Sequence, residues 1–73
     1  MPKLGVFSGQ EVCRILEKHG FTPVRQRGSH AVMQMRTPNG GTLTVPVPLH
    51  KEIRTGTLLS IIRQSGVSRN AFE

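Results

Sequence analysis

Aspartate, tryptophan and tyrosine are absent from the 73 residues, and cysteine occurs once. A lone Cys13 forms neither an internal disulfide nor a thiolate zinc site, which excludes a disulfide-stapled secreted scaffold. The four acidic residues are all glutamates spread along the chain, whereas a two-metal nuclease clusters carboxylates around its ions. No apolar run approaches the roughly 20 residues that span a bilayer. We therefore expect a reduced, cytoplasmic protein with no metal, no cofactor and no membrane contact.

Basic residues, in contrast, are abundant. Ten lysines and arginines against four glutamates give a formal charge of +6. A chain this short is expected to form one domain over residues 1–73, with a thin core and no room for a second lobe. The positive charge favours a polyanionic partner, which is a nucleic acid, an acidic protein or an anionic membrane. Of these, we expect a nucleic acid.

The helix and strand signals predict the order α-β-β-β-α. Ser8 and Glu11 have the spacing of a capping box, which starts a helix with an apolar stripe. Gly20 is expected to end this helix in left-handed geometry. Thr55 is the expected N-cap of the second helix, and Gly66 its end. The expected helices are residues 9–19 and 55–65, and the expected strands are residues 21–27, 30–36 and 42–47. Ser68 is expected to cap a last short turn that carries Phe72 into the core.

The strands are expected to form an antiparallel sheet with both helices on one face, a two-layer α+β fold. Pro23 marks the first strand as an edge, while Pro46 and Pro48 are expected to end the sheet. Alternation in the second strand separates two faces. One face holds Ala31, Met33 and Met35, and the other holds His30, Val32, Gln34 and Arg36. The helix-free face then carries His30, Arg36 and, by alternation in the first strand, Arg25 and Arg27.

A histidine on a basic open face suits RNA cleavage, which needs no metal because the 2′-hydroxyl is the nucleophile. Imidazole titrates near neutral pH and moves protons, and arginine stabilises the charge on phosphorus. His30 follows Gly28, which allows close backbone approach to a phosphate, and Ser29, which adds a hydroxyl donor. His50 and Lys51, in the connector after the third strand, are candidates for substrate contact. His19 is interpreted instead as a helix-end residue, and Cys13 as a small buried hydrophobe.

Three stretches together resemble the HicA family, the small toxins of HicAB toxin–antitoxin pairs, over nearly the whole chain. They are SGQEVCRILEKHGF, VRQRGSH and VPVPLHKEIRTGTLLSIIRQSGVS. The resemblance implies a fold like that of a double-stranded-RNA-binding domain, and a metal-independent endoribonuclease that cuts mRNA and arrests translation. It places the catalytic histidine of the G-S-H motif on His30. It also implies a HicB-type antitoxin that covers the active face. Pro23 is a small departure, which puts the regularity of the first strand in doubt.

The sequence hypothesis is therefore an RNA-cleaving toxin in which His30 transfers a proton, as acid or as base. The residues expected to bind RNA are Arg25, Arg27, Arg36, His50 and Lys51, with Gly28 and Ser29 shaping the site. One alternative is a non-catalytic RNA-binding module that docks by shape and charge. Another is an adaptor whose basic face serves only an acidic protein partner.

Overall fold

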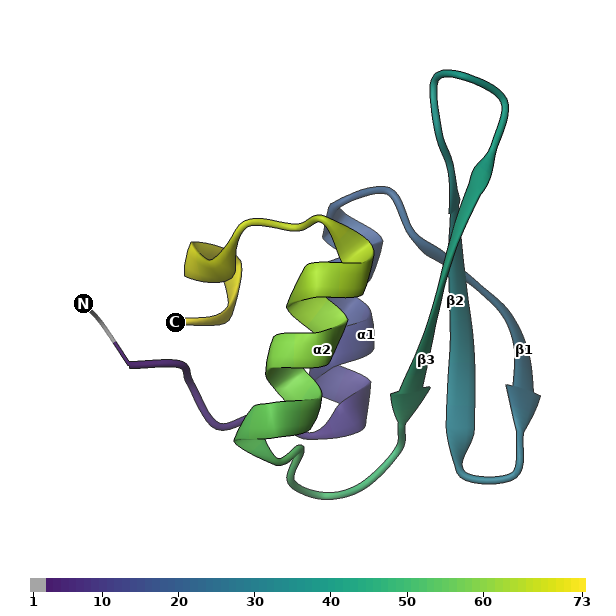
Figure 1. Ribbon diagram of the computed structural model, residues 1–73. Coiled ribbons are helices and arrows are strands. Elements are labelled where there is room, and N and C mark those ends of the chain that lie inside the picture. Colours follow the sequence, from purple (N-terminus) through teal and green to yellow (C-terminus); the bar gives the residue numbers. More distant parts are fainter. Residues whose placement is uncertain (1–2) are drawn as a thin grey trace.

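The computed structural model describes residues 3–73 and confirms the predicted order α-β-β-β-α. Its elements are α1 (Gly9–Lys18), β1 (Thr22–Arg27), β2 (His30–Arg36), β3 (Thr42–Pro48), α2 (Thr55–Ser65) and a short 3₁₀ helix, η1 (Arg69–Phe72). Both helices lie on one side of the antiparallel sheet, and the other side of the sheet is free of helices (Figure 1). The protein therefore has the expected α+β architecture with one covered and one open sheet face.

The first helix begins as its capping box predicts. The Ser8 hydroxyl accepts a hydrogen bond from the Glu11 amide at 3.1 Å, and the Glu11 carboxylate accepts one from the Ser8 amide at 2.8 Å. α1 ends at Lys18, one residue earlier than expected, because His19 already leaves helical geometry before the left-handed Gly20. The capped start of α1 is thus fixed by side chains that belong to the helix itself.

The second helix has the predicted bounds but a different cap. Its N-cap is Arg54, not Thr55, and no side chain bonds to the helix start. The prediction of Thr55 was wrong because Arg54 has the extended backbone, and its carbonyl accepts the first helical bond from Leu58 at 2.9 Å. Gly66 ends the helix in left-handed geometry, as expected. Ser68 is the N-cap of η1, although its hydroxyl bonds to the Asn70 side chain rather than to the backbone.

The sheet has β2 at its centre, so β1 and β3 are both edge strands. Pro23 lies in β1, which confirms the expectation of an edge. Pro46 lies within β3 and does not end it, whereas Pro48 is the last residue of the strand, as expected, and the strand runs one residue further than predicted. An edge strand accommodates them because the N–H that proline lacks is not needed on the unpaired side.

A register shift in β1 decides which way its arginines face. Pro23 pairs with Met33, and Arg25 pairs with Val32, so Val24 has no partner. Without this extra residue, strict alternation from the buried Phe21 would turn both Arg25 and Arg27 toward the helices. The shift reverses the phase and turns both arginines to the helix-free face. The doubt that Pro23 raised about this strand is therefore confirmed. The predicted face of the arginines is right, but the register shift produces it, and not the regular alternation from which it was predicted.

The core lies between the covered sheet face and the two helices. Its buried side chains are Val12, Leu16, Phe21, Met33, Val45, Val47, Ile53, Leu58, Ile61, Val67 and Phe72. The Phe7 and Phe72 rings meet edge to face, with centroids 6.2 Å apart. Of the helices in residues 3–73, none has the length and hydropathy required to cross a membrane.

Candidate functional site

One row of residues at an end of the helix-free face brings together the main predicted groups. His30 on β2 pairs with Arg27 on β1 and with Pro48 on β3, so the three side chains lie side by side on one face. Both His30 and Arg27 are exposed. His30 is therefore exposed next to Arg27 on the helix-free face and is not covered by the helices.

The next row is centred on an apolar residue. Val32 lies between Arg25 and Pro46 in the register and is only 7% exposed, although it faces away from the core. On the central strand, the neighbouring cross-strand side chains are what cover it. The helix-free face thus combines the basic strand β1 with apolar residues of β2 and β3, namely Val32, Pro46 and Pro48.

Arg36 lies apart from the other candidates. It pairs with Thr42 at the far end of β2, six residues along the strand from His30. At about 3.3 Å per residue, this separation is about 20 Å. The structure therefore places Arg36 on the predicted face but does not bring it to His30.

The turn before His30 has a conformation suited to glycine. Gly28 has a φ of +57°, in the left-handed region, and the side-chain amide of Gln26 donates to its carbonyl at 3.1 Å. A Cβ at Gly28 would meet nothing within 4 Å. The backbone conformation alone accounts for this glycine, and the space above the turn is open, as a site for a bulky ligand requires.

The connector after β3 is fixed to this same turn. The Leu49 amide donates to the Ser29 carbonyl at 2.6 Å, which links the residue before His50 to the residue before His30. His50 and Lys51 are both exposed. The G-S-H motif and the connector segment that contains His50 are thus joined by a backbone hydrogen bond across twenty residues of sequence.

The start of α1 holds the connector from its other side. The Gly9 amide donates to the His50 carbonyl at 2.9 Å. A Cβ built on Gly9 would lie 2.1 Å from the Pro48 carbonyl oxygen and 2.7 Å from the Leu49 Cα. Gly9 is therefore required for close backbone contact. Gly9 was not among the predicted site residues, although a glycine in the first turn of a helix, where it weakens the helix, is a usable signal of such contact.

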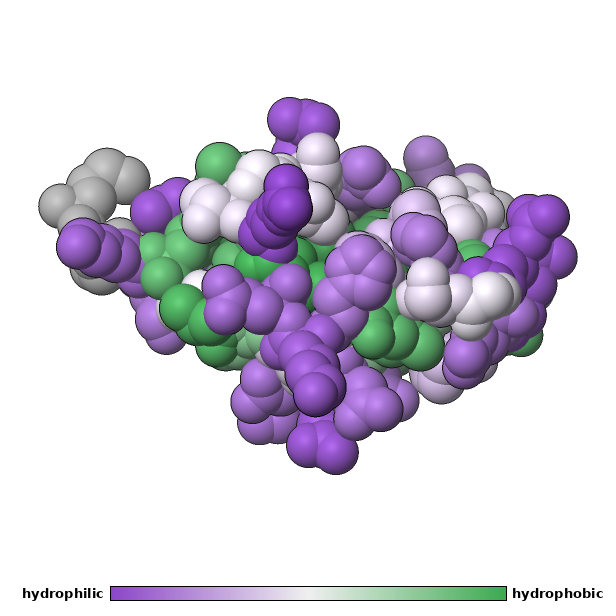
Figure 2. All heavy atoms as spheres, turned by 90° about the horizontal axis from the view of Figure 1, so that it is seen from below, coloured by the Kyte–Doolittle hydropathy of each residue, from purple (hydrophilic) through white to green (hydrophobic). Residues whose placement is uncertain are grey.

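Figure 2 views the molecule from this end. Hydrophilic side chains cover most of the surface there, with apolar atoms showing between them. The basic residues of the β1 end and the connector are Arg25, Arg27, Lys51 and Arg54. The acidic residues of α1 and the connector are Glu11, Glu17 and Glu52. With Arg14 and Lys18 of α1 included, β1, α1 and the connector hold six basic and three acidic residues, so the local charge is positive. In residues 3–73, no group of three or more His, Cys, Asp or Glu side chains is arranged to hold a metal ion.

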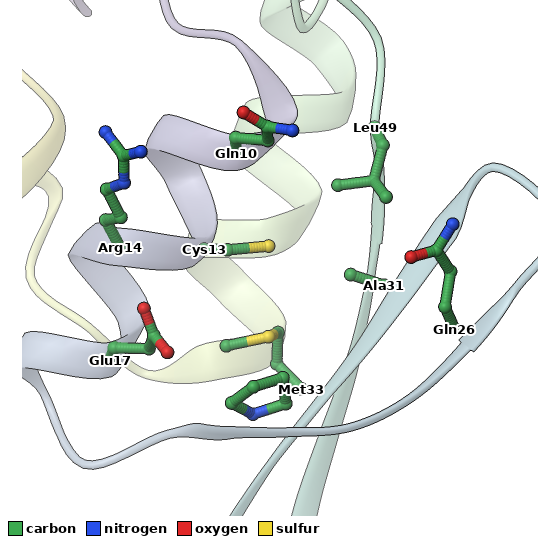
Figure 3. Close-up of a pocket in the computed structure, with 9 residues that line it drawn as sticks. Gln10, Cys13, Arg14, Glu17, Gln26, Ala31, Met33 and Leu49 are labelled. Atoms are coloured by element: carbon green, nitrogen blue, oxygen red, sulfur yellow. The ribbon is translucent and has the colours of Figure 1, made fainter.

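A groove of about 420 Å³ lies on the other side of β1, between that strand and α1 (Figure 3). Cys13, Glu17 and Gln26 are among its lining residues. Burial, and secondarily the charge of Glu17, raise the pKa of the Cys13 thiol, which favours the protonated and unreactive form. Because Gln26 pairs with the helix-facing Ala31, the groove opens on the covered side of the sheet and is separate from the His30 surface.

The chain matches one known protein family over most of its length. A family model described as "HicA toxin of bacterial toxin-antitoxin" matches residues 9–67, from the first residue of α1 to a point just after α2. The matched region contains every candidate site residue named above. A search of curated proteins gave no significant match.

Proposed function

Because the chain belongs to the HicA family, the toxins of bacterial toxin–antitoxin systems, we propose that it is a metal-independent endoribonuclease that cleaves mRNA and arrests translation. His30 is the proposed proton-transfer residue. The site of action is the cytoplasm, where mRNA is translated. Family membership implies a cognate antitoxin, and the proposal identifies it as a HicB-type protein that covers the helix-free face.

The observation that carries the proposal is the pairing of His30 with Arg27 on an exposed face. In RNA cleavage, the 2′-oxygen loses its proton and attacks phosphorus, and the 5′-oxygen leaves with a proton. An imidazole performs either transfer near neutral pH. An adjacent guanidinium stabilises the negative charge that gathers on the phosphate oxygens. The two side chains that the chemistry needs are thus direct cross-strand neighbours.

The remaining predicted residues are assigned to RNA binding. Arg25 and Arg27 form a basic line along β1, and Lys51 adds a charge from the connector. Gly28 and Ser29 shape the turn, and the open space above Gly28 accommodates a phosphate group. Arg36, about 20 Å from His30 along β2, serves as an outer contact for a longer strand.

The test compares the wild-type protein with His30→Ala on mRNA in excess chelator. We expect cutting by the wild type and a loss of about 10²- to 10⁴-fold in rate for the variant, with RNA binding retained. His19→Ala is the matched control, because His19 lies at the far end of α1 with its Nδ1 2.9 Å from the Ile15 carbonyl. Cleavage that disappears with chelator would contradict the metal-free mechanism.

The non-catalytic RNA-binding module is the competing function. It fits the same basic face, because shape and charge suffice for docking on RNA. Binding of RNA by a folded wild-type protein that leaves the RNA intact would favour this module over the nuclease.

A further inference from the structure

The proposed cleavage needs two proton transfers at two different oxygens. In an in-line displacement, the attacking 2′-oxygen and the leaving 5′-oxygen lie on opposite sides of phosphorus. A single imidazole beside one of these oxygens does not reach the other in the same step. A second proton-transfer group is therefore expected on the far side of the phosphate.

The backbone places one such group close to His30. The Cα atoms of His30 and Pro48 are partners in the antiparallel ladder, about 5 Å apart. His50 lies two residues beyond Pro48, and two extended residues span at most about 7 Å. The Cα atoms of the two histidines therefore lie within about 12 Å, an interval that two imidazole side chains and one phosphate group can bridge.

This placement is fixed and does not depend on a free loop. The Leu49 amide bonds to the Ser29 carbonyl, and the His50 carbonyl accepts from the Gly9 amide. The residues just before the two histidines, Ser29 and Leu49, are thereby bonded to each other, and His50 itself is bonded to the start of α1. Such backbone restraint is what a positioned acid–base group requires.

The other ionisable groups at this end are less suited. The Glu11 carboxylate is engaged by the Ser8 amide at the helix start. Lys51 and the arginines are assigned to binding the RNA phosphates and not to proton transfer. His19 lies at the opposite end of α1. Glu52, which is exposed in the connector, is the remaining competitor, and the experiment includes it.

We propose that His50 is the second acid–base group of the cleavage site and works as a pair with His30 on one phosphodiester. This inference rests on the proposed nuclease function. One imidazole, neutral at the start, takes the 2′-hydroxyl proton while the 2′-oxygen bonds to phosphorus. The other, protonated at the start, gives its proton to the 5′-oxygen as the bond between phosphorus and that oxygen breaks. The products are a 2′,3′-cyclic phosphate and a 5′-hydroxyl end.

The experiment measures kcat and KM on two RNA substrates. The proteins are the wild type, His30→Ala, His50→Gln and Glu52→Gln, with His19→Gln as the matched histidine control. One substrate is an ordinary RNA oligonucleotide. The other carries a bridging sulfur in place of the leaving 5′-oxygen at the cut position, and a thiolate leaves without a proton donor. Thermal unfolding of each variant establishes that it is folded, which we expect for a substitution at the exposed His50.

On ordinary RNA, we expect His30→Ala and His50→Gln each to lower kcat about 10²- to 10⁴-fold. KM is expected to stay within about threefold of the wild-type value, because a proton-transfer group acts in the transition state. On the sulfur-bridged RNA, one of these two variants regains the wild-type rate and the other does not. The variant that recovers has lost the acid, and the other has lost the base.

Three results would overturn the inference. They are an unchanged kcat in His50→Gln, a loss confined to KM, and any sulfur-substrate pattern other than recovery of one variant of the pair. A large kcat loss in Glu52→Gln that the sulfur substrate repairs would assign the acid to Glu52 instead. Failure of the inference is distinguishable from failure of the nuclease function. In the first case the wild type cuts and His30→Ala does not, whereas in the second the wild type does not cut at all.

Discussion

The two hairpin turns of the sheet lie at opposite ends of β2 and differ in what holds them. The turn at Gly28 and Ser29 is bonded to the connector, which is bonded in turn to the start of α1. The turn over residues 37–41 bonds within itself, through the Thr37 amide to the Gly41 carbonyl at 2.9 Å and the Gly40 amide to the Thr37 carbonyl at 3.0 Å. In Figure 1 the hairpin of β2 and β3 extends well beyond the helices.

This difference explains where the candidate chemistry lies. Acid–base catalysis depends on side chains held close to a productive geometry, and this requires support from surrounding elements. The supported end carries His30, Arg27 and His50, whereas the unsupported hairpin carries only Arg36 among the predicted site residues. We expect substitutions at the supported end to reduce RNA cleavage more than substitutions at the unsupported hairpin, even where both lower the stability by the same amount.

The largest effect is expected from Gly9→Ala, which attacks the support of the site end directly. A Cβ there would lie 2.1 Å from the Pro48 carbonyl oxygen, so the connector and α1 must move apart. We expect a loss of about 2–3 kcal/mol in unfolding free energy, the upper part of the range for overpacking, and a melting temperature lower by about 10 °C or more. RNA cleavage should fall with it, because the connector carries His50.

Gly56→Ala is the matched control for that substitution. Gly56 also lies in the first turn of a helix, but a Cβ at this position would meet nothing within 4 Å. Alanine favours helix over glycine, so we expect a gain of up to about 0.5–1 kcal/mol. Chemical denaturation of both variants measures the contrast, and equal stability of the two would show that the contact at Gly9 is not tight.

The next effect compares the two turns at equal backbone cost. Gly28 and Gly40 both have a left-handed φ, +57° and +89°, and neither has an atom within 4 Å of a new Cβ. Alanine at either position is expected to cost about 1–2 kcal/mol, the penalty for a left-handed residue. Only Gly28→Ala should also slow RNA cleavage, by about tenfold, since it displaces the residues next to His30.

Asparagine tests whether the backbone is the cause, because asparagine adopts left-handed geometry more readily than alanine. We expect Gly28→Asn to keep more activity than Gly28→Ala in single-turnover cleavage assays. An equal loss of cleavage in Gly40→Ala and Gly28→Ala would remove the distinction between the two turns.

A smaller effect is expected from the charges at the two ends. Arg27→Ala should weaken RNA binding about tenfold, as loss of a charge-assisted hydrogen bond does, and reduce the salt dependence of log K by about 0.7. Arg36→Ala, about 20 Å away along β2, should change binding less than Arg27→Ala. Fluorescence anisotropy with labelled RNA measures both, in a His30→Ala background that leaves the RNA uncut. Equal losses would mean that RNA lies along the whole face.

Much of the fold could be predicted from local sequence signals, because those signals act within a few residues. The Ser8 and Glu11 cap, the left-handed Gly66 and the alternation of β2 each depend on neighbours in sequence. The wrong N-cap at Thr55 shows the limit of such signals. There the connector already holds Arg54 in extended geometry, so the preference of threonine for the cap position has no effect.

The arrangement of the site was less accessible from sequence, since it depends on contacts between distant segments. The Ser29 to Leu49 hydrogen bond, and the space that Gly9 leaves for Pro48, join residues twenty or more positions apart. Periodicity also could not show that Val24 lacks a partner in β1, although this shift determines the face of Arg25 and Arg27. The sequence therefore predicted which residues belong to the site, but only the tertiary structure shows which of them lie close together.

The smallest effect is expected from Glu11→Gln, which loosens the start of α1 without moving Gly9. Hydrogen bonds from the Ser8 amide and then from the Ser8 hydroxyl lower the pKa of Glu11 from its ordinary value of 4.5. A carboxylate with a lower pKa in the folded state adds stability that is fully present above the unfolded pKa and is lost as pH falls through the folded one. Thermal unfolding at neutral pH should therefore show a melting temperature of Glu11→Gln slightly below that of the wild type, and the gap should close as the pH falls below about 4.5.

Glu17→Gln removes the same charge from the last turn of α1, where a negative charge opposes the helix dipole, so it should not reproduce this gap. A gap that persisted at low pH would assign the effect to the shape of the side chain and not to the charge of the cap.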